Sequence, residues 1–392
     1  MADIRESTEP PLKGIVVADF SRVLAGPLAT MMLGDLGAEI IKVERPGAGD
    51  ETRTWGPPYT ADGDSAYYLS VNRNKRSIAL DLRDEDQRTR AREIALAADV
   101  MIENFRADAM QRFGLGYDAL KGENPELVYC RISGFGSERG RDLPGYDFLV
   151  QALSGLMSIT GEPDGPPMKT GVAVVDVLTG LHATIGILAA LHERQRTRRG
   201  QMVEVNLFSS ALASLVNQAS SYLTTGTVPE RIANQHPSIA PYEAFFTASM
   251  PIVIAVGNDG QFRNLCRALG AEEMASNALW SSNKDRVKNR SALKLALEEI
   301  LTTKSDEHWL SVLKDNDVPC GPINNIAEAF KLAKSLDLDA VQELVKPNGE
   351  SVATVSNPIT FSRTPVSYDL APPKLGADTA RVMKSLRRKS AN

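Results

Sequence analysis

Asp176 is the residue whose type and position most suggest chemistry. It stands where an apolar run over residues 172–175 meets a helical pattern that continues to about residue 194. Open α/β folds place reactive groups in a crevice at the carboxyl ends of their strands, so a carboxylate at such a junction could act as a nucleophile. Asp is also among the commonest helix N-cap residues, where its side chain accepts hydrogen bonds from free backbone amides. Spacing alone favours the cap, and the nucleophile remains a hypothesis that needs other residues in its support.

Cationic side chains recur in the loops ahead of Asp176. Arg45 follows the second expected strand, Lys75 and Arg76 lie in the segment VNRNKRSIALDL, and Arg112 lies in a helix after ENF. Arg and Lys near strand ends could neutralise the 3′-phosphate and the pyrophosphate of coenzyme A by charge-assisted hydrogen bonds. Taken singly, each is more simply a solvated surface cation.

The first strand, turn and helix have the layout of a nucleotide-binding unit, with Glu44 at the end of the second strand. The glycine fingerprint GxGxxG is missing, because Ala25, Gly26 and Pro27 stand in the turn. The backbone cradle for a pyrophosphate is therefore absent, and NAD binding is weakly supported.

A second loop of interest is VGNDGQF, residues 256–262, which follows an apolar strand directly. Its two glycines, Asn and Asp are the usual residues of a tight turn. The functional alternative is a mobile lid whose backbone approaches a ligand and closes over it to exclude water.

The composition excludes several classes of protein. The chain has 392 residues, 43% of them hydrophobic and 24% charged, with a formal net charge of −5. These values are typical of a globular protein of two or three domains, and no run of eighteen apolar residues predicts a membrane span. The slight acidity, with only one short basic run at residues 194–199, argues against a nucleic-acid partner.

The metal and redox chemistry of the chain is also limited. Three widely spaced cysteines and four histidines indicate neither a disulfide framework nor a metal site. The first residues, MADIRESTEPP, lack the pattern of a secretory signal or a transit peptide. We expect no metal, and a reducing compartment: the cytoplasm, or the mitochondrial matrix for a form without its transit peptide.

The elements that must position these residues alternate between strand and helix in the first third of the chain, which predicts βαβ units and a largely parallel sheet. Strands are expected at residues 14–20, 39–44, 100–103, 127–132, 202–208 and 251–257. Helices are expected at residues 27–36, 84–98, 107–113, 176–194 and 209–223. A shift to Thr, Pro and Asn near residue 224 predicts a domain boundary.

Several long segments together resemble the signature blocks of the family III CoA-transferases, over nearly the whole chain. They are RVLAGPLATMMLGDLGAEIIKVERPGAGDETRTWGPP, YYLSVNRNKRSIALDL, MIENF, GYDFLVQALSGLMSITG, GVAVVDVLTGL, RRGQMVEVNL and VPCGPINN. Within that family, the segments GAGDETRTWGPP and HPSIAPYEAF are most similar to the succinyl-CoA:glutarate transferases.

The resemblance implies that Asp176 is the family's catalytic aspartate. Its carboxylate would attack the donor thioester, with succinyl-CoA as the expected donor, to give a mixed anhydride and CoA thiolate. The thiolate would then form an aspartyl-CoA thioester, and a dicarboxylic acid, with glutarate the first candidate, would reverse the sequence. The helix dipole would help to keep Asp176 ionised, and nearby backbone amides would stabilise the oxyanions.

The resemblance also implies two sets of binding residues, for a coenzyme A thioester that is a substrate and not a permanently bound cofactor. Those expected to contact CoA are Val23, Leu24, Ala25, Arg45, Leu69, Lys75, Arg76, Asn104, Phe105, Arg112 and Phe135. Those expected at the acceptor or in the closing loop are Arg22, Tyr146, His236, Ser238, Gly257, Asn258, Asp259, Gly260 and Gln261. A cation or hydrogen-bond donors are needed for the acceptor's distal carboxylate. His236 could equally cap the following turn.

The fold implied by the resemblance is α/β, with a Rossmann-like large domain, a smaller α/β domain and an interlocked homodimer. The expected divisions are residues 1–205 for the first part of the large CoA-binding domain, 206–226 for a linker, 227–328 for the small domain and 329–392 for a return segment that completes the large domain.

Three departures from the family pattern leave alternatives open. Ala107 and Asp108 replace an expected Pro-Gly, residues 197–201 read TRRGQ, and the closing loop has fewer glycines than the oxalate enzymes carry. Itaconate, mesaconate, malate-like acids and oxalate thus remain alternative acceptors. A 2-methylacyl-CoA racemase needs a His and Asp pair, but Tyr146 stands where that block has His. A non-catalytic CoA-binding protein is the third class.

Overall fold

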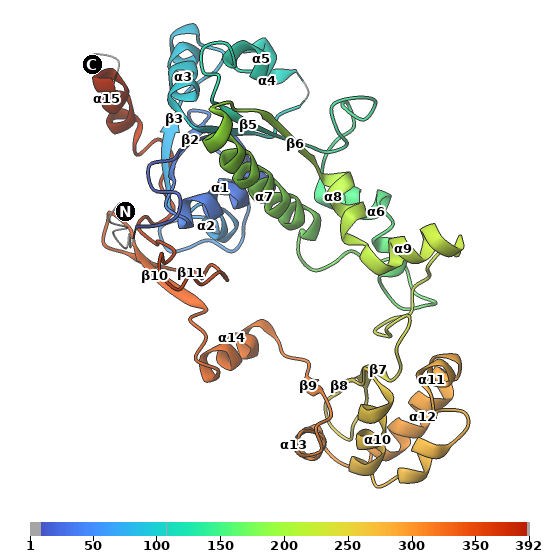
Figure 1. Cartoon of the computed structure of the whole chain (residues 1–392). Helices are drawn as coiled ribbons and strands as arrows, with labels where there is room; N and C mark the ends of the chain where they lie inside the picture. Colours follow the sequence, from blue (N-terminus) through green and yellow to red (C-terminus); the bar gives the residue numbers. More distant parts are fainter. Residues whose placement is uncertain (1–8, 107, 390–392) are drawn as a thin grey trace, which may run out of the picture. The chain divides into compact units, whose positions relative to one another are not determined.

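The structure is a computed structural model that describes residues 9–106 and 108–389 (Figure 1). The chain divides into two compact units. The first contains the residues up to 156, residues 170–226 and those from 338 onward, and the second contains residues 157–169 and 227–337.

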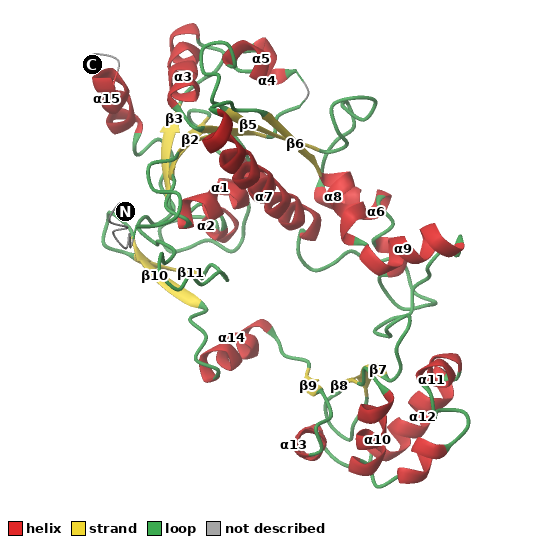
Figure 2. Ribbon diagram, in the orientation of Figure 1, coloured by secondary structure: helices red, strands yellow, loops and turns green. Residues whose placement is uncertain are grey.

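A six-stranded sheet forms the centre of the first unit, and all its neighbouring strands are parallel. Its order is β3-β2-β1-β4-β5-β6, which is the doubly wound order of the Rossmann fold. The strands are β1 (Val16–Asp19), β2 (Glu39–Glu44), β3 (Lys75–Ala79), β4 (Val100–Glu103), β5 (Val128–Ser133) and β6 (Met202–Asn206). This sheet, flanked by helices in Figure 2, confirms the predicted fold class.

Helices bury both faces of the sheet, because alternate residues of each strand enter different hydrophobic clusters. Val17 of β1 packs with one face, whereas its neighbour Ala18 packs with the other. The first face is covered by α1 (Ala25–Asp35), α6 (Asp147–Leu153), α7 (Val174–Thr197) and α8 (Leu207–Ser214). The second is covered by α3 (Glu85–Ala97), α4 (Ala109–Arg112), α5 (Tyr117–Leu120) and α15 (Thr379–Lys389).

The return of the chain adds a hairpin of β10 (Val341–Val345) and β11 (Ser351–Val355) to the first unit. Buried Arg73 ties this hairpin to the sheet domain. Its guanidinium donates to both carboxylate oxygens of Asp35, at 2.9 and 2.6 Å, and to the Val355 carbonyl at 2.9 Å. Both side chains of this ion pair are almost fully buried, so neither can be removed without leaving an uncompensated charge.

The second unit has its own core around a three-stranded antiparallel sheet of order β7-β8-β9. Its strands are β7 (Tyr242–Phe245), β8 (Ile252–Ala255) and β9 (Cys320–Pro322). Its helices are η2 (Met157–Ile159), α10 (Asp259–Ala268), η3 (Glu272–Ser276), α11 (Asn283–Lys288), α12 (Arg290–Leu301), α13 (Asp306–Asp315) and α14 (Ile326–Ser335). The expected smaller α/β unit is therefore present.

Four expectations about the elements need correction. The apolar run at residues 172–175 is not a strand, because α7 already begins at Val174. Residues 206–226, expected to be a linker, form α8 and α9 (Val216–Thr225) within the first unit. The return to the first unit comes at residue 338 instead of 329. The helix expected over residues 107–113 begins at Ala109, and Ala107 lies outside the described residues.

Among the described residues, helix α7 is the one whose length and composition would allow a membrane span. It has 24 residues and contains an 18-residue window of mean hydropathy 1.8. Length and composition are weak evidence for a membrane, because the core helix of a globular protein meets the same criteria. Ala183, Ile187 and Leu191 of α7 are in fact buried in the core against the sheet.

Candidate active site

Asp176 lies in the first turn of α7, not at its N-cap. The N-cap position is Ala173, whose side chain cannot accept a hydrogen bond. Another aspartate supplies the missing cap: Oδ1 of Asp147, at the start of α6, accepts from the amides of Val175 at 2.8 Å and of Asp176 at 3.1 Å. Asp176 therefore does not cap the helix through its side chain; its own backbone amide is capped by Asp147.

Asp147 is itself held by a buried glutamine. The side-chain amide of Gln151 donates to Oδ2 of Asp147 at 2.7 Å, and its oxygen accepts from the backbone amide of Thr170 at 3.0 Å. Asp147 therefore accepts three N–H hydrogen bonds and donates none, as a carboxylate does. Neither residue was among the site residues expected from the sequence, although Asp147 directly follows Tyr146 in one of the family blocks.

Burial and the neighbouring charge together make Asp176 a weak acid. Burial disfavours its ionised form most, the Asp147 carboxylate adds like-charge repulsion, and the pKa of Asp176 rises to about 7. Both effects act against the help expected from the helix dipole, so the carboxyl is not held fully ionised near neutral pH. Near neutral pH the carboxyl is divided between its acid and its more basic carboxylate form.

Tyr67, in the short helix α2 (Ala66–Ser70), faces the same region. It packs in a cluster with Ala173 and Val177 on either side of Asp176, and its ring lies edge-on to Trp55 at 5.1 Å. Burial, followed by the charge of Asp176, raises the pKa of Tyr67 to about 12. The hydroxyl thus stays protonated, and it is available as a hydrogen-bond donor.

The loop after β1 reaches this cluster in a strained conformation. Val23 has a φ of 70°, a left-handed value that is costly for a β-branched residue. Its amide donates to both carboxylate oxygens of Asp50 at 3.3 Å, and Asp50 accepts from Lys42 Nζ at 2.9 Å. Burial opposes ionisation of Asp50, but the Lys42 ammonium holds its pKa below the usual value. This fully buried ion pair fixes the loop that was expected to line the CoA path.

The loops after β1 and β4 meet at the switch point of the sheet, where open α/β folds bind ligands. The side chain of Asn104 accepts from the amide of Arg22 at 2.9 Å and donates to its carbonyl at 2.7 Å. The Arg22 guanidinium lies 4.8 Å from the ring centre of Phe105 and pairs with Glu51 at 2.8 Å. Four of the expected site residues, Arg22, Val23, Asn104 and Phe105, are therefore brought together.

Close packing of α1 on α7 brings the start of α1 to the first turns of α7. A Cβ atom at Gly180 would lie only 2.7 Å from the carbonyl oxygen of Ala25, so the absence of a side chain permits this approach. Leu24 packs in the cluster that contains Tyr67 and Val177. The expected residues Leu24 and Ala25 are thus placed beside the turn that carries Asp176.

The side chains of three expected CoA contacts are engaged elsewhere in the structure. Lys75 is buried, and its ammonium donates to Asp19, Asn72 and the Pro27 carbonyl. Burial lowers its pKa to about 8, with the charge of Asp19 opposing the shift. The side chain of Leu69 is buried against the β10–β11 hairpin.

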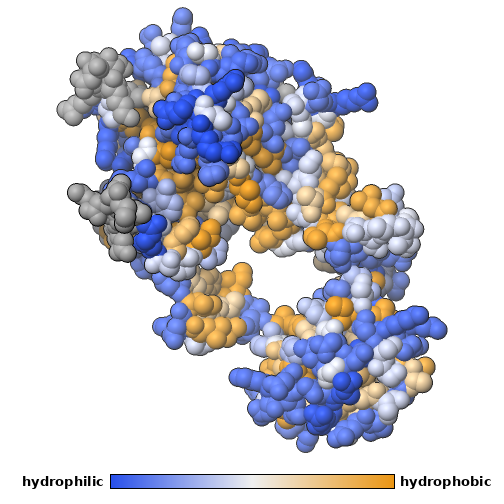
Figure 3. All heavy atoms as spheres, viewed as in Figure 1, coloured by the Kyte–Doolittle hydropathy of each residue, from blue (hydrophilic) through white to orange (hydrophobic). Residues whose placement is uncertain are grey.

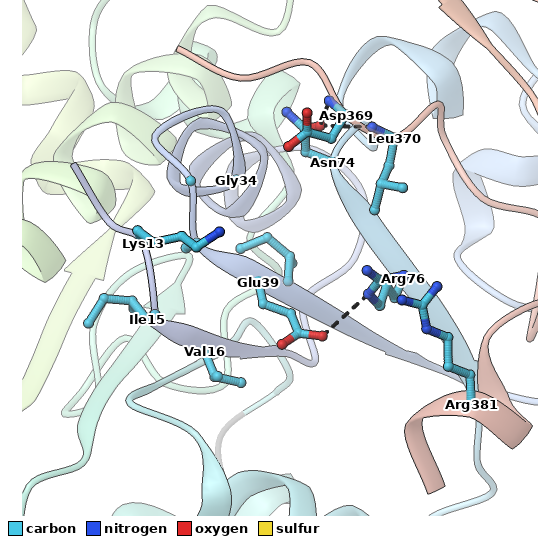
Figure 4. A pocket seen from close by; sticks show the side chains of 14 residues that line it. Lys13, Ile15, Val16, Gly34, Glu39, Asn74, Arg76, Asp369, Leu370 and Arg381 are labelled. Carbon is cyan, nitrogen blue, oxygen red and sulfur yellow. Dashed lines mark hydrogen bonds and ion pairs between the residues drawn. The ribbon is translucent and has the colours of Figure 1, made fainter. Parts of the chain in front are cut away.

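Arg76 is the third, because it lies at the amino-terminal edge of the sheet. It pairs there with Glu39, the first residue of β2, at 3.3 Å. Arg76 lines a cavity of about 460 Å³ together with Lys13 and Arg381 (Figure 4). The reactive crevice of such a sheet lies at the opposite edge, so this cavity belongs to a different part of the fold.

The remaining CoA candidates are placed without contradiction. Arg45 and Arg112 are exposed, just past β2 and at the end of α4. Phe135, after β5, packs against Phe208 at 5.5 Å between ring centres. Tyr146, which was expected at the acceptor and not at CoA, precedes α6 and is 67% exposed. Within residues 9–106 and 108–389, no group of three His, Cys, Asp or Glu side chains could hold a metal ion.

The other acceptor candidates belong to the second unit, whereas Asp176 belongs to the first. Nδ1 of His236 accepts from the amide of Ser238 at 3.1 Å, so His236 does cap the turn that follows it.

The predicted closing loop over residues 257–261 is the capped start of α10. The Asn258 side chain accepts from the amide of Gln261, whose own side chain accepts from the amide of Gly257. Asp259 is bound to the buried guanidinium of Arg286 at 2.7 Å, and Gly260 lies in the same helical turn. These contacts show a structured turn at residues 257–261, and their role as a closing loop stays a prediction.

Comparison with known proteins identifies relatives along almost the whole chain. The model of CoA-transferase family III matches residues 12–379. The chain is 44% identical to succinate–glutarate CoA-transferase of Agrobacterium fabrum, covering 96% of each chain, and 40% identical to succinyl-CoA:glutarate CoA-transferase of Homo sapiens, covering 96% of this chain and 86% of the other. A crystal structure of a CAIB/BAIF family protein from Brucella suis superposes with a TM-score of 0.86 at 41% identity, covering 96% and 100% of the two chains.

The raised pKa of Asp176 predicts a pH-dependent cost to stability. The pKa of Asp176 is higher in the folded than in the unfolded protein. Below the unfolded pKa both states are protonated, so the group has no effect on stability. As the pH rises from there towards 7, ionisation favours the unfolded state and the fold becomes less stable. The Asp176→Asn variant should therefore exceed the parent in free energy of unfolding by up to about 4 kcal/mol near pH 8 and nearly match it near pH 4. Urea denaturation at both pH values measures this difference. Asp118→Asn, at an exposed carboxylate, serves as the control and should show no gain near pH 8; an equal gain there would contradict the prediction.

Proposed function

Because the chain belongs to CoA-transferase family III, we propose that it transfers CoA from succinyl-CoA to glutarate, with Asp176 as the nucleophile. One observation carries this proposal: a partly buried carboxyl of raised pKa stands in a turn fixed by Asp147, beside loops that meet at the switch point of a Rossmann-like sheet. The two relatives named for succinate or succinyl-CoA and glutarate support the choice of donor and acceptor.

The reaction needs a nucleophile whose bond to the acyl group forms and breaks readily in both directions. A carboxylate oxygen of Asp176 attacks the succinyl carbonyl carbon, the C–S bond breaks, and CoA leaves as its thiolate. The thiolate attacks the aspartyl carbonyl, which releases succinate and leaves an aspartyl-CoA thioester. Glutarate then attacks this thioester, and the returning thiolate takes the glutaryl group. A carboxylate suits these steps, because an ester of serine would be too stable to exchange.

Fixed hydrogen-bond donors near Asp176 can stabilise the charge that develops on the oxygen in each attack. The hydroxyl of Tyr67 is kept protonated beside Asp176 by its raised pKa. Strained Val23, held by Asp50, keeps the loop after β1 in place before substrate arrives. The exposed cations Arg45 and Arg112 remain the proposed partners of the CoA phosphates.

The acceptor's distal carboxylate needs a cation or hydrogen-bond donors, and Arg22, His236 and Ser238 are the candidates. Arg22 is supported by its place at the switch point, where Glu51 and the ring of Phe105 already orient its guanidinium. Exchange of Glu51 for a substrate carboxylate would keep this charge-assisted hydrogen bond. His236 and Ser238, joined by one hydrogen bond, would act as a pair.

We also propose that the protein is an interlocked homodimer. Large apolar side chains are exposed on both units, including Leu223 of α9 at 80% and Ile326 of α14 at 79%. Figure 3 shows apolar residues gathered on the surface over α9 and over α14. Exposed apolar surface of this extent is typical of an interface.

The free cysteines Cys130, Cys266 and Cys320 fit a reducing compartment, either the cytoplasm or a mitochondrial matrix.

The function is tested by substrate and by covalent adduct. Purified protein with succinyl-CoA should form glutaryl-CoA faster than the CoA ester of itaconate, mesaconate, malate or oxalate. Intact-protein mass spectrometry after incubation with succinyl-CoA alone should show an adduct, and digestion should locate it on the peptide containing Asp176. Asp176→Asn should abolish both, with a loss of at least about 10⁴-fold in kcat. Failure with every acid, or an adduct on another residue, would overturn the proposal.

The dimer is tested by mass and by exchange of subunits. Native mass spectrometry should show twice the 42.5 kDa of one chain. A mixture of ¹⁵N-labelled and unlabelled protein should give mixed dimers only after unfolding and refolding, because interlocked chains cannot separate while folded. A monomer mass, or mixed dimers without denaturant, would contradict an interlocked assembly.

A further inference from the structure

The pairing of Asp147 with the amides of Val175 and Asp176 places a second carboxylate against the proposed nucleophile. A neutral side chain, such as Ser or Asn, would serve as well for capping a helix. Gln151 holds the second oxygen of this carboxylate at 2.7 Å and is itself anchored on Thr170, so the charge cannot swing away from Asp176. Cap and charge are therefore combined in one fixed group.

We propose that Asp147 is a positioning residue that holds the first turn of α7 and maintains a negative charge against Asp176, so that the uncharged acyl forms of Asp176 are favoured over the free carboxylate. The inference rests on the proposed function, since it concerns the covalent intermediates of that reaction. Nothing in the proposed transfer itself requires a second acidic group beside the nucleophile.

The charge balance of the first step shows why the position of Asp147 matters. When Asp176 bonds to the succinyl carbon, the electron pair of the broken C–S bond leaves with sulfur. One negative charge thus moves from Asp176 to the CoA thiolate, away from Asp147. Repulsion between the two carboxylates is present before this step and absent after it, and it is strong where water is partly excluded. Asp147 therefore raises the energy of the free carboxylate relative to the anhydride and the thioester.

The other titratable or charged groups around the first turn of α7 are either neutral or paired elsewhere. Tyr67 of α2 stays protonated because its pKa is raised to about 12. Asp50, ahead of η1 (Glu51–Thr54), acts on Tyr67 and is paired with Lys42. His182, further along α7, is hydrogen-bonded to Ser210. Among the described residues, Asp147 is the charged group that raises the pKa of Asp176, after burial itself.

Two variants separate the charge of Asp147 from its hydrogen bonds. Asp147→Asn removes the charge but turns an amide N–H towards the N–H of Gln151, which disturbs the network. Combining Asp147→Asn with Gln151→Glu restores every bond: the Asn oxygen caps α7, its nitrogen donates to Glu, and Glu accepts from Thr170. The net charge of the double variant is that of the parent, but the carboxylate now belongs to residue 151 instead of residue 147 and is no longer in contact with the first turn of α7.

The readouts are the ionisation of Asp176 and the amount of covalent enzyme. Titration of ¹³Cγ-labelled aspartate by NMR gives the pKa of Asp176, whose signal is assigned by its loss in Asp176→Asn. We expect this pKa to fall by about one unit in Asp147→Asn and by a smaller amount in the double variant. At equilibrium with succinyl-CoA, the ratio of acylated to free enzyme should fall about tenfold in the single variant and less in the double variant.

The double variant decides between a charge effect and a purely structural cap. A pKa and an adduct ratio that return to the parent values would overturn the proposal, as would no change in either variant. If the single variant does not fold, the double variant still gives the answer, since its hydrogen bonds are intact. The NMR titration needs no substrate: if the parent forms no adduct, the proposed function fails, while the effect of Asp147 on Asp176 is measured independently.

Discussion

The contact between the Asp147 carboxylate and the first turn of α7 is the constraint on which the rest of the site depends. Helix α7 begins without a capping side chain of its own, so its first amides need an acceptor from another element. Asp147 satisfies two of them and, by its charge, makes the carboxyl of Asp176 a weaker acid. The repulsion between the two carboxylates lowers the stability of the fold at the site of the proposed reaction, as is common at functional sites.

The sheet brings the other parts of the site to this turn. Because β1 and β4 are neighbours in the order 3-2-1-4-5-6, the loops that follow them meet at the switch point. Asn104 links the two loops through Arg22, and the buried pair of Lys42 and Asp50 holds Val23 in its strained conformation. The close approach of α1 and α7 at Gly180 then places these loops beside Asp176. The site is thus assembled by packing and buried charge before any substrate binds.

The strands with continuous apolar runs could be predicted from the sequence: β2 and β4 begin and end at the expected residues. Strand β3 could not, because its first residues, Lys75 and Arg76, resemble a basic loop until Asp19 is seen to neutralise Lys75 in the interior. The run before Asp176 is as apolar as a strand but forms the start of a helix, since its cap comes from Asp147, far along the chain. Asp176 was singled out by the family resemblance. The role of Asp147 could not be predicted in this way, because it depends on a contact between α6 and α7 that no local sequence pattern reveals.

The central claim, that Asp176 carries the acyl group and then CoA, is tested most directly by following oxygen. In the proposed sequence, each turnover moves one oxygen atom from the acceptor carboxylate to the carboxyl of Asp176. After turnover with succinyl-CoA and ¹⁸O-labelled glutarate, mass spectrometry of the digested protein should find ¹⁸O in the peptide that contains Asp176, with none in the peptide that contains Asp147. Glutaryl-CoA formation without label at Asp176, or with label at another residue, would contradict this account.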